Sequence, residues 1–536
     1  MCAMRKKEER MKKTVCKMLG ISLAAAMLLA GCGGSGGQTS PASEQNPAGQ
    51  ENAAGSTKDT LVYAMSSDPG TVDPYANMAL NLRLSTQVVE SLVMYDANGD
   101  ISPQLAESWE YDEDGKGLTV HLRQNVTFSN GDPLTAEDVV YSCEQAMGNP
   151  TYVGALGAFD LASVKAVDDN TVYFPLTGVV GTAHYVLSNV FVVNKNTYEE
   201  NHAVDIIGTG PFIVERYTAG DAITFKANEN YWGGAPAIKH LTMRFITEAS
   251  VRMTELENGT VDMIDSPTAE DINRVIAGES KGISYQESVR APKVQFVGIN
   301  TASVPDIKVR QALLYAIDQE AIFKGAYSSL GELGSGILPG GWWYSSETQG
   351  NLPYDPEKAK ELLAEAGYNE SNPLSVRIAY ASNLTERAAA AEIIYNELTS
   401  VGVNVTLAGS EQAIVTDQLN NTNDYEMFLT NYGNLFEPGS CLKQKLDSIA
   451  NVIGGSGYFR YGGTEFGDQI DAKLAEALAT ADDVERAKIY QQIQDDIADY
   501  AISKSFVDQK DYGLMTESLQ GVWWQPNPCF KEAAFH

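Results

Sequence analysis

The sequence predicts an α/β fold, in a mixed α+β variant, that is organised as two or more lobes. Segments with the two-residue repeat of strands alternate with segments that have the 3.6-residue repeat of helices. Once a leader and a linker are set aside, about 480 residues remain, more than one hydrophobic core usually supports. We find no internal repeat and no heptad array.

Residues 1–31 have the parts of a secretory signal peptide. A basic start precedes an apolar run over residues 18–30, which is too short to span a bilayer because a membrane helix needs about 20 apolar residues. The run ends in Leu29-Ala30-Gly31-Cys32, which resembles the bacterial lipobox, where the cysteine is acylated and the chain is cut before it. A plain signal peptide with a chance cysteine is the weaker interpretation. We expect an extracytoplasmic lipoprotein that is anchored to the bacterial membrane by lipidated Cys32.

Residues 32–58 are predicted to be a flexible tether. After Cys32 they consist mainly of Gly, Ser, Ala, Gln, Asn and Pro without apolar periodicity, a composition that cannot form a core. Residues 33–37 match the G-x-S-x-G pattern of hydrolase nucleophiles, but neither the strand nor the helix that this chemistry requires flanks them. We interpret them as linker.

The mature chain is strongly acidic. Residues 1–31 hold seven of the 38 Lys and Arg residues and two of the 70 Asp and Glu residues, so the remainder has a formal net charge of −37. The negative electrostatic potential of such a chain argues against partners such as nucleic acid or anionic lipid headgroups. It favours a monomer, because copies of the chain repel one another.

Neither the cysteines nor the histidines have the spacing of a metal site. Cys143, Cys441 and Cys529 remain after cleavage and lipidation, and their separations fit neither a disulfide scaffold nor a C-x-x-C motif. The five histidines are scattered, without an H-x-x-x-H motif. We therefore expect no metal site and no cofactor, and we assign Cys143 to the core because it lies on the apolar stripe of a helix.

Up to about residue 300, most predicted elements are strands. They cover residues 61–65, 118–122, 171–174, 212–214, 223–225 and 241–245. Two helices interrupt them. The i+4 repeat of Leu80, Leu84 and Val88 predicts a helix through Ser91, and the capping-box sequence over residues 135–138 predicts the start of another.

Beyond residue 300, helices joined by strands are predicted. An apolar stripe indicates a helix over residues 306–323, and Asp355, Pro356 and Gly367 mark the beginning and the end of the next one. Further helices are expected at residues 385–402, 470–479 and 484–501, with an alternating strand at 403–407. The chain finishes on Val522-Trp523-Trp524, whose tryptophans we assign to the core.

Six stretches, taken in order, are similar to a known family. They are Leu105-Ala106-Glu107-Ser108-Trp109-Glu110, residues 126–142 (VTFSNGDPLTAEDVVYS), Gly208-Thr209-Gly210-Pro211-Phe212, Asn230-Tyr231-Trp232-Gly233-Gly234, residues 309–318 (VRQALLYAID) and residues 355–363 (DPEKAKELL). Together they resemble the large extracytoplasmic solute-binding proteins of peptide-type ABC importers, bacterial solute-binding protein family 5. The resemblance covers essentially all of the chain after the tether.

The resemblance implies a two-lobed, type II periplasmic-binding-protein-like fold that encloses its ligand by hinge closure. Lobe one would comprise residues 59–296 and 513–536, with residues 97–205 as a peripheral subdomain, and lobe two would comprise residues 297–512. The implied partners are a peptide or another small solute and an ABC permease with its ATPase subunits. The chain itself has no G-x-x-x-x-G-K-[ST] phosphate loop.

The resemblance also places candidate ligand-binding residues in lobe two. Peptide binders of this family typically read aromatic-x-x-Asp-x-x-Asp/Glu-Pro, and the first Asp pairs with the peptide ammonium. Anchored on Glu437-Pro438, Asn434 takes the Asp position and Asn431 the aromatic one, with Tyr432 shifted by one residue. Phe428 stands where some oligopeptide binders have an Arg. Both charge anchors are therefore missing in this register; a misregistered surface loop is the alternative.

Other cleft candidates rest on position alone. Ser66, Ser67 and Asp68 follow the first strand, where the chain of this family borders the cleft. Tyr458 lies where the family has a pocket-lining segment. The aromatic residues 342–344 would suit stacking on a ligand.

The leading function is capture of a peptide or similar solute for delivery to a permease. An oligosaccharide or another non-peptide solute, including a metal chelate, is the alternative ligand, and a solute sensor is the alternative role. A secreted hydrolase is the rival class, but paired carboxylates such as Glu107, Asp112 or Glu437 are a weak signal in so acidic a chain. No Ser/His/Asp or Cys/His arrangement has supporting context, so we expect no enzyme activity.

Overall fold

The computed structural model describes residues 58–76, 83–201, 203–288, 293–327, 330–338, 352–433, 438–524 and 527–536. The expected signal peptide, Cys32 and all of the expected tether except Lys58 lie outside these ranges. Within them, no helix is both long and apolar enough to cross a membrane.

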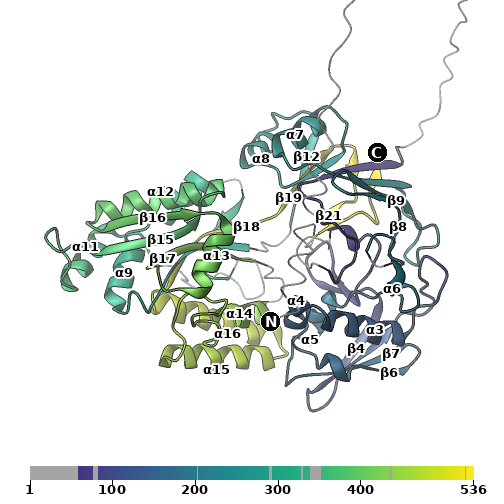
Figure 1. Ribbon diagram of the computed structural model, residues 1–536, viewed down its shortest axis with the longest axis horizontal. Helices are drawn as coiled ribbons and strands as arrows, with labels where there is room; N and C mark the ends of the chain where they lie inside the picture. The colour runs from purple at the N-terminus through teal and green to yellow at the C-terminus, as the bar shows by residue number, and fades with distance from the viewer. Residues whose placement is uncertain are drawn as a thin grey trace, which may run out of the picture. The chain divides into compact units, whose positions relative to one another are not determined.

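A seven-stranded mixed sheet is the framework of lobe one (Figure 1). Its strands, in spatial order, are β12 (Ile283–Glu287), β19 (Tyr512–Thr516), β11 (Met263–Asp265), β1 (Thr60–Met65), β10 (His240–Phe245), β9 (Ala222–Ala227) and β8 (Phe212–Thr218). β1 runs parallel to both of its neighbours. It lies in the middle because Tyr63 packs into one apolar cluster and Ala64 into another on the opposite face.

A four-stranded antiparallel sheet lies within the expected peripheral subdomain. Its order is β4 (Ala106–Tyr111), β5 (Gly117–Leu122), β7 (Thr171–Pro175) and β6 (Lys165–Asp168), and helix α3 (Ala136–Met147) contacts β6 and β7. The expected capping box is present, since the Thr135 backbone N–H donates to the Asp138 carboxylate at 3.0 Å. Cys143 on α3 is buried in the core, as predicted.

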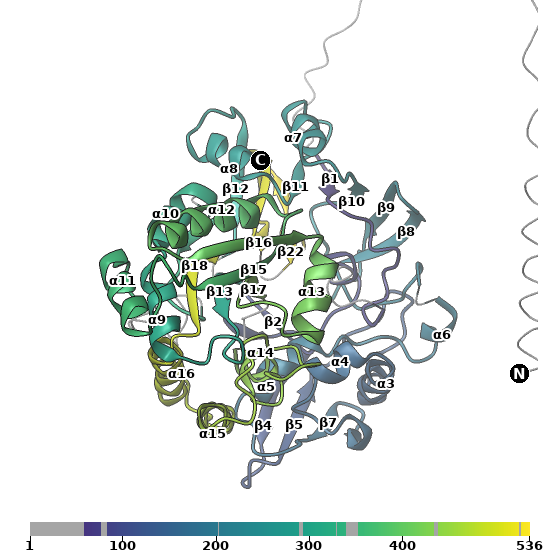
Figure 2. The same cartoon turned by 60° about the vertical axis from the view of Figure 1, so that its left-hand side comes forward.

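A six-stranded mixed sheet is the framework of lobe two (Figure 2). Its strands, in order, are β14 (Gly331–Leu333), β18 (Ser503–Gln509), β13 (Lys293–Ile299), β17 (Met427–Gly433), β15 (Ser375–Ala381) and β16 (Asn404–Ser410). β13 buries Phe296 on one face and Val297 on the other. Helices α9 (Ile307–Tyr315), α11 (Pro356–Glu365) and α12 (Thr385–Ser400) share the Val297 cluster, and α15 (Glu465–Ala479) and α16 (Asp483–Asp499) share the Phe296 cluster.

The remaining elements are short. The other helices are α4 (Pro150–Ala155), α5 (Ala183–Val186), α6 (Tyr198–Asn201), α7 (Ala249–Glu257), α8 (Ala269–Ile276), α10 (Gln319–Ile322), α13 (Gln412–Asn421) and α14 (Pro438–Leu446). Two-stranded pairs are formed by β2 (Val93–Tyr95) with β3 (Ile101–Pro103), β20 (Leu519–Gln520) with β23 (Ala534–Phe535), and β21 (Trp523–Trp524) with β22 (Pro528–Cys529).

The chain passes between the two large sheets twice. It leaves lobe one after β12 and enters lobe two at β13, and it returns between β18 and β19. The expected boundaries at 296/297 and 512/513 fall inside β13 and β19, whereas the crossings lie between β12 and β13 and between β18 and β19. The division into two lobes with a 97–205 subdomain stays our proposal.

Two helices differ from the sequence expectation. Of the helix expected through Ser91, the described part is helical only at residues 83–85, because the carbonyls of Gln87 and Val88 accept hydrogen bonds from Phe212 at 3.0 Å and Gly210 at 2.8 Å. The helix expected over residues 306–323 is two helices, α9 and α10. The Asp318 carboxylate caps α10 by accepting from the Ala321 N–H at 3.1 Å.

Candidate functional site

A pocket of about 280 Å³ lies at the two chain crossings. Lobe one contributes Arg83, Ser266 and Trp524 to its lining. Lobe two contributes Lys293, Gln295, Arg387 and Gln509, and the return crossing contributes Lys510 and Asp511. Because residues from the beginning, middle and end of the described chain meet here, the pocket exists only in the folded protein.

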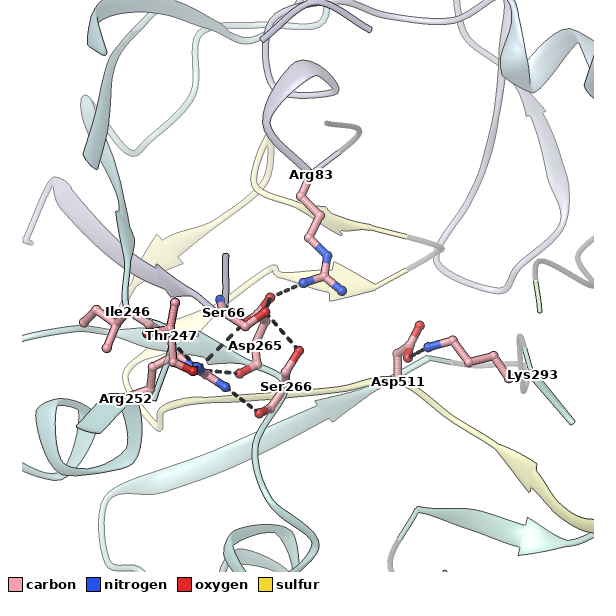
Figure 3. Close-up of polar contacts among 9 residues, drawn as sticks. All are labelled: Ser66, Arg83, Ile246, Thr247, Arg252, Asp265, Ser266, Lys293 and Asp511. Atoms are coloured by element: carbon pink, nitrogen blue, oxygen red, sulfur yellow. Dashed lines mark hydrogen bonds and ion pairs between the residues drawn. The ribbon is translucent and has the colours of Figure 1, made fainter. Parts of the chain in front are cut away.

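On the lobe-one side, the buried carboxylate of Asp265 organises the wall (Figure 3). Asp265 ends β11 and accepts hydrogen bonds from the Ser66 backbone N–H at 2.7 Å and from the Ser66 hydroxyl at 3.1 Å. It also pairs with Arg83 and, at 3.8 Å, with Arg252. Burial raises the pKa of Asp265, and the two guanidinium groups oppose that shift. Two arginines thus share one carboxylate.

Arg252 is fixed in place by backbone carbonyls. Its guanidinium donates to the carbonyl oxygens of Asp265, Ile246, Thr247 and Ser266 at distances of 2.7–3.1 Å. Its side chain is only 2 % exposed, whereas that of Arg83 is 27 % exposed. Arg83 therefore presents the charge of this pair to the pocket, and its guanidinium lies 5.8 Å from the ring centre of the buried Trp524.

On the lobe-two side, Arg387 is a buried cation with neutral partners. It lies in the first turn of α12 and is 4 % exposed. Its guanidinium donates to the amide oxygens of Gln412 at 2.7 Å, Asn431 at 2.9 Å and Gln295 at 3.1 Å. Burial lowers the pKa of Arg387, and Tyr327 and Glu386 partly offset this. Among the described side chains, none forms an ion pair with it.

The two lysines of the pocket have carboxylate partners. Lys293, at the start of β13, donates to Asp511 at 2.6 Å and so joins lobe two to the return crossing (Figure 3). Lys510 lies 3.0 Å from Glu287 of lobe one and 3.3 Å from Glu332 of lobe two. Burial lowers the pKa of Lys510, but its hydrogen bonds to these carboxylates raise it above the ordinary value. The lysine charges are thus neutralised locally.

Comparison with known proteins identifies the family. The model of "Bacterial extracellular solute-binding proteins, family 5 Middle" matches residues 100–443. Heme-binding protein A of Haemophilus influenzae is 31% identical over 515 residues, which cover 88% of this chain and 90% of that protein. The chain belongs to family 5 of the bacterial extracellular solute-binding proteins. The dipeptide-binding protein of Escherichia coli is 29% identical, with 82% and 88% covered.

Solved structures of family 5 proteins share the fold of this chain. HbpA2 from Haemophilus parasuis superimposes with a TM-score of 0.77 at 28% identity, over 89% of this chain and all of that one. NikA from Brucella suis in complex with Fe(III)-EDTA gives a TM-score of 0.78 at 21% identity, over 89% and 100%, which speaks for the fold alone. The two-lobed α/β fold expected from the sequence is confirmed.

Two of the sequence-predicted site residues of this family 5 protein lie next to the pocket lining. Ser66 contacts Asp265 behind Arg83, and Asn431 accepts a hydrogen bond from Arg387. Ser67 is half-buried in the turn after β1. The Asp68 carboxylate is occupied by the fold of lobe one, since it accepts from Tyr217 at 2.9 Å and from the Gly220 N–H at 2.7 Å.

The other predicted residues lie in the core or outside the described ranges. Tyr432 and Tyr458 are buried in the apolar cluster that contains Phe296 and Phe428. Asn434 and Glu437 are not among the described residues, and neither are the aromatic residues 342–344. Trp524 is buried, as expected for a core residue, and also borders the pocket. The ligand-binding roles of all these residues remain predictions.

Sequence reasoning missed the arginines of the pocket. Arg387 could have been found, because its spacing from Ala391, Ile394 and Leu398 puts a cation on the apolar stripe of a helix. Arg83 gives no comparable signal, because its partner Asp265 is distant in sequence. Among the described residues, no group of three or more His, Cys, Asp or Glu side chains is placed to hold a metal ion.

Proposed function

We propose that this family 5 protein is the substrate-binding component of an ABC importer, and that it captures a short peptide in the pocket and delivers it to a permease. The observation that carries the proposal is Arg387. Among the described residues, its buried guanidinium bonds only neutral groups, namely three side-chain amides and the Tyr327 hydroxyl, and so has no counter-charge there. The carboxylate of a peptide supplies one with matching bidentate geometry.

The size of the pocket supports a small ligand. Its volume of about 280 Å³ is just below the range of about 300–1,000 Å³ that is usual for ligand sites. A dipeptide or tripeptide therefore fits the site better than a longer oligopeptide. Relatives named for dipeptide and glutathione agree with this. Relatives named for heme and nickel support the alternative, a non-peptide solute such as a metal chelate.

Capture by hinge closure follows from the two crossings. A ligand that contacts Arg387 in lobe two and the Arg83 wall in lobe one stabilises the conformation in which both walls line one pocket. Such a protein binds its ligand without converting it. An adjacent gene pair for a permease and an ATPase would favour the importer role over that of a solute sensor.

The test of the peptide function is calorimetric titration with dipeptides and tripeptides. Arg387→Met should weaken binding by about 10- to 100-fold, because hydrogen bonds to charged groups contribute about 1.5–3 kcal/mol. Asn431→Asp should also weaken it, because the new carboxylate would neutralise Arg387 internally. Arg377→Met is the matched control, since Arg377 pairs with Asp424 outside the pocket. If no peptide binds the parent protein, the proposed function is wrong.

The lipid anchor is a separate proposal that rests on Leu29-Ala30-Gly31-Cys32. Replacing Cys32 by Ala should leave an uncleaved precursor or release the protein from the membrane, because no thiol remains to be acylated. Labelling with a radioactive fatty acid and cell fractionation measure both effects. A variant that stays membrane-bound and fully processed would contradict the anchor.

A further inference from the structure

The positive charges of the pocket are neutralised unevenly. Lys293 and Lys510 each have a carboxylate partner at 3.0 Å or closer. Arg387 has none among the described residues, and Glu386 beside it is half-exposed, where water weakens its field. The lobe-two wall therefore holds one buried cation that is available to a ligand anion.

The lobe-one wall holds a second such cation. Asp265 is fully buried and carries one negative charge at most, whereas both Arg83 and Arg252 lie against it. Arg252 remains beside Asp265, because four backbone carbonyls fix its guanidinium. Arg83 is therefore not needed to balance the carboxylate. In Figure 3 its second Nη points away from Asp265.

We propose, on the basis of the proposed peptide-binding function, that the preferred ligand is a short peptide with an acidic side chain, and that Arg83 is the residue that selects it. One carboxylate of the ligand binds Arg387 in lobe two, and the other binds Arg83 in lobe one. The surplus charge on each wall then has a partner, and the ligand joins the two lobes through ionic contacts at both ends.

Trp524 supports the guanidinium of Arg83, to which the second carboxylate of the ligand would bind. Its indole is buried beneath the Arg83 guanidinium, 5.8 Å from ring centre to guanidinium carbon, so Arg83 is supported from below. A carboxylate above this plane meets a guanidinium that is already oriented, which lowers the ordering cost of the contact. A neutral amide in the same place forms a hydrogen bond but leaves the surplus charge unpaired.

The test compares isosteric peptides. Ala-Glu and Ala-Gln, Glu-Ala and Gln-Ala, and Ala-Ala-Glu and Ala-Ala-Gln are titrated calorimetrically into the full-length mature protein. In at least one pair the Glu peptide should bind about tenfold more tightly than its Gln counterpart. Arg83→Gln should weaken binding of the Glu peptide more than that of the Gln peptide and so remove that preference. Arg244→Gln is the matched control, because Arg244 pairs with Glu255 in the same lobe outside the pocket.

The outcomes separate this inference from the peptide function itself. Equal affinities within every pair, with Gln peptides still dependent on Arg387, would overturn the acidic preference and leave the peptide function standing. If Arg83→Gln weakened both members of a pair equally, Arg83 would be a structural residue and the inference would be wrong. If no peptide bound at all, the peptide function would fail, and this inference would fail with it.

Discussion

Arg83 and Arg387 line the same pocket from different lobes, but their immediate partners differ. Arg83 shares a buried carboxylate with a second arginine, and Arg387 bonds, among the described residues, to amide oxygens and to the Tyr327 hydroxyl. In both cases a positive charge is kept close to the pocket: Arg83 has only a share of one carboxylate, and Arg387 has no ion-pair partner within the described part of the chain. Such cations are costly to bury without an anion, and that cost is relieved when an anionic ligand binds.

The resemblance-based register assigned Asn431 to the ligand, and the structure gives that residue a different neighbour. Its amide oxygen accepts from Arg387 and so orients the guanidinium without neutralising it. An aspartate at the same position would cancel the charge. The amide of Asn431 thus leaves the charge of Arg387 uncancelled, whereas the acidic anchor expected at the position of Asn434 lies outside the described residues.

The buried side chain of His184 makes the free energy of unfolding depend on pH. Burial, assisted by Arg486, lowers the pKa of His184 to about 4. The unfolded chain, with an ordinary histidine pKa of about 6.5, takes up a proton that the folded protein does not. The stability that the neutral His184 contributes to the folded protein is therefore fully present above about pH 6.5, and it is lost as the pH falls from about 6.5 to about 4.

We expect His184→Gln to lose less thermal stability than the parent protein over that pH range, as measured by calorimetric melting at pH 7 and pH 4.5. The control is His121→Gln, because the His121 side chain is 44% exposed. Identical losses in the parent and in His184→Gln would contradict the assignment.

Among the secondary-structure elements, helix ends were predicted correctly where the local sequence contains the capping residues. The helix predicted from Asp355, Pro356 and Gly367 is α11, with Asp355 accepting from the Lys358 N–H at 2.9 Å. The helix predicted through Ser91 failed because Gly208 and Gly210, which follow far along the chain, approach the Val88 carbonyl. An ideal Cβ at Gly208 would lie 1.9 Å from that oxygen. A contact of this kind leaves no trace in the local sequence.

A second contact between the lobes lies away from the pocket, between the loop before α5 and the end of α15. The Gly181 N–H donates to the Leu478 carbonyl at 2.8 Å, and an ideal Cβ at Gly181 would lie 2.6 Å from the Ala481 nitrogen. Gly181→Val should force these segments apart and weaken peptide binding by about tenfold, since overpacking typically costs about 1–3 kcal/mol.

The matched control for this contact is Gly178→Val. A Cβ at Gly178 meets no atom within 4 Å, so this variant should bind like the parent protein. Titration calorimetry measures both. If Gly181→Val kept the parental affinity, the contact would have no part in ligand-dependent closure.

For the whole molecule, the amino-acid sequence was enough to predict the fold but not enough to predict the pocket. Six motifs in order indicated the family, and buried strands such as β1 could be predicted from their apolar runs. The pocket could not, because it joins Arg83, Lys293, Arg387 and Asp511 from separate elements. Its charge balance depends on which carboxylate each cation reaches, and that is set by sheet order and not by spacing along the chain.

The central claim is that a peptide carboxylate is the missing partner of Arg387 in the pocket between the lobes. The most direct measurement is a crystal structure of the mature protein with a bound dipeptide or tripeptide. We predict a ligand carboxylate within hydrogen-bonding distance of the Arg387 guanidinium, with the rest of the peptide directed towards Arg83. A peptide bound elsewhere, or a bound peptide without a carboxylate at Arg387, would contradict the account.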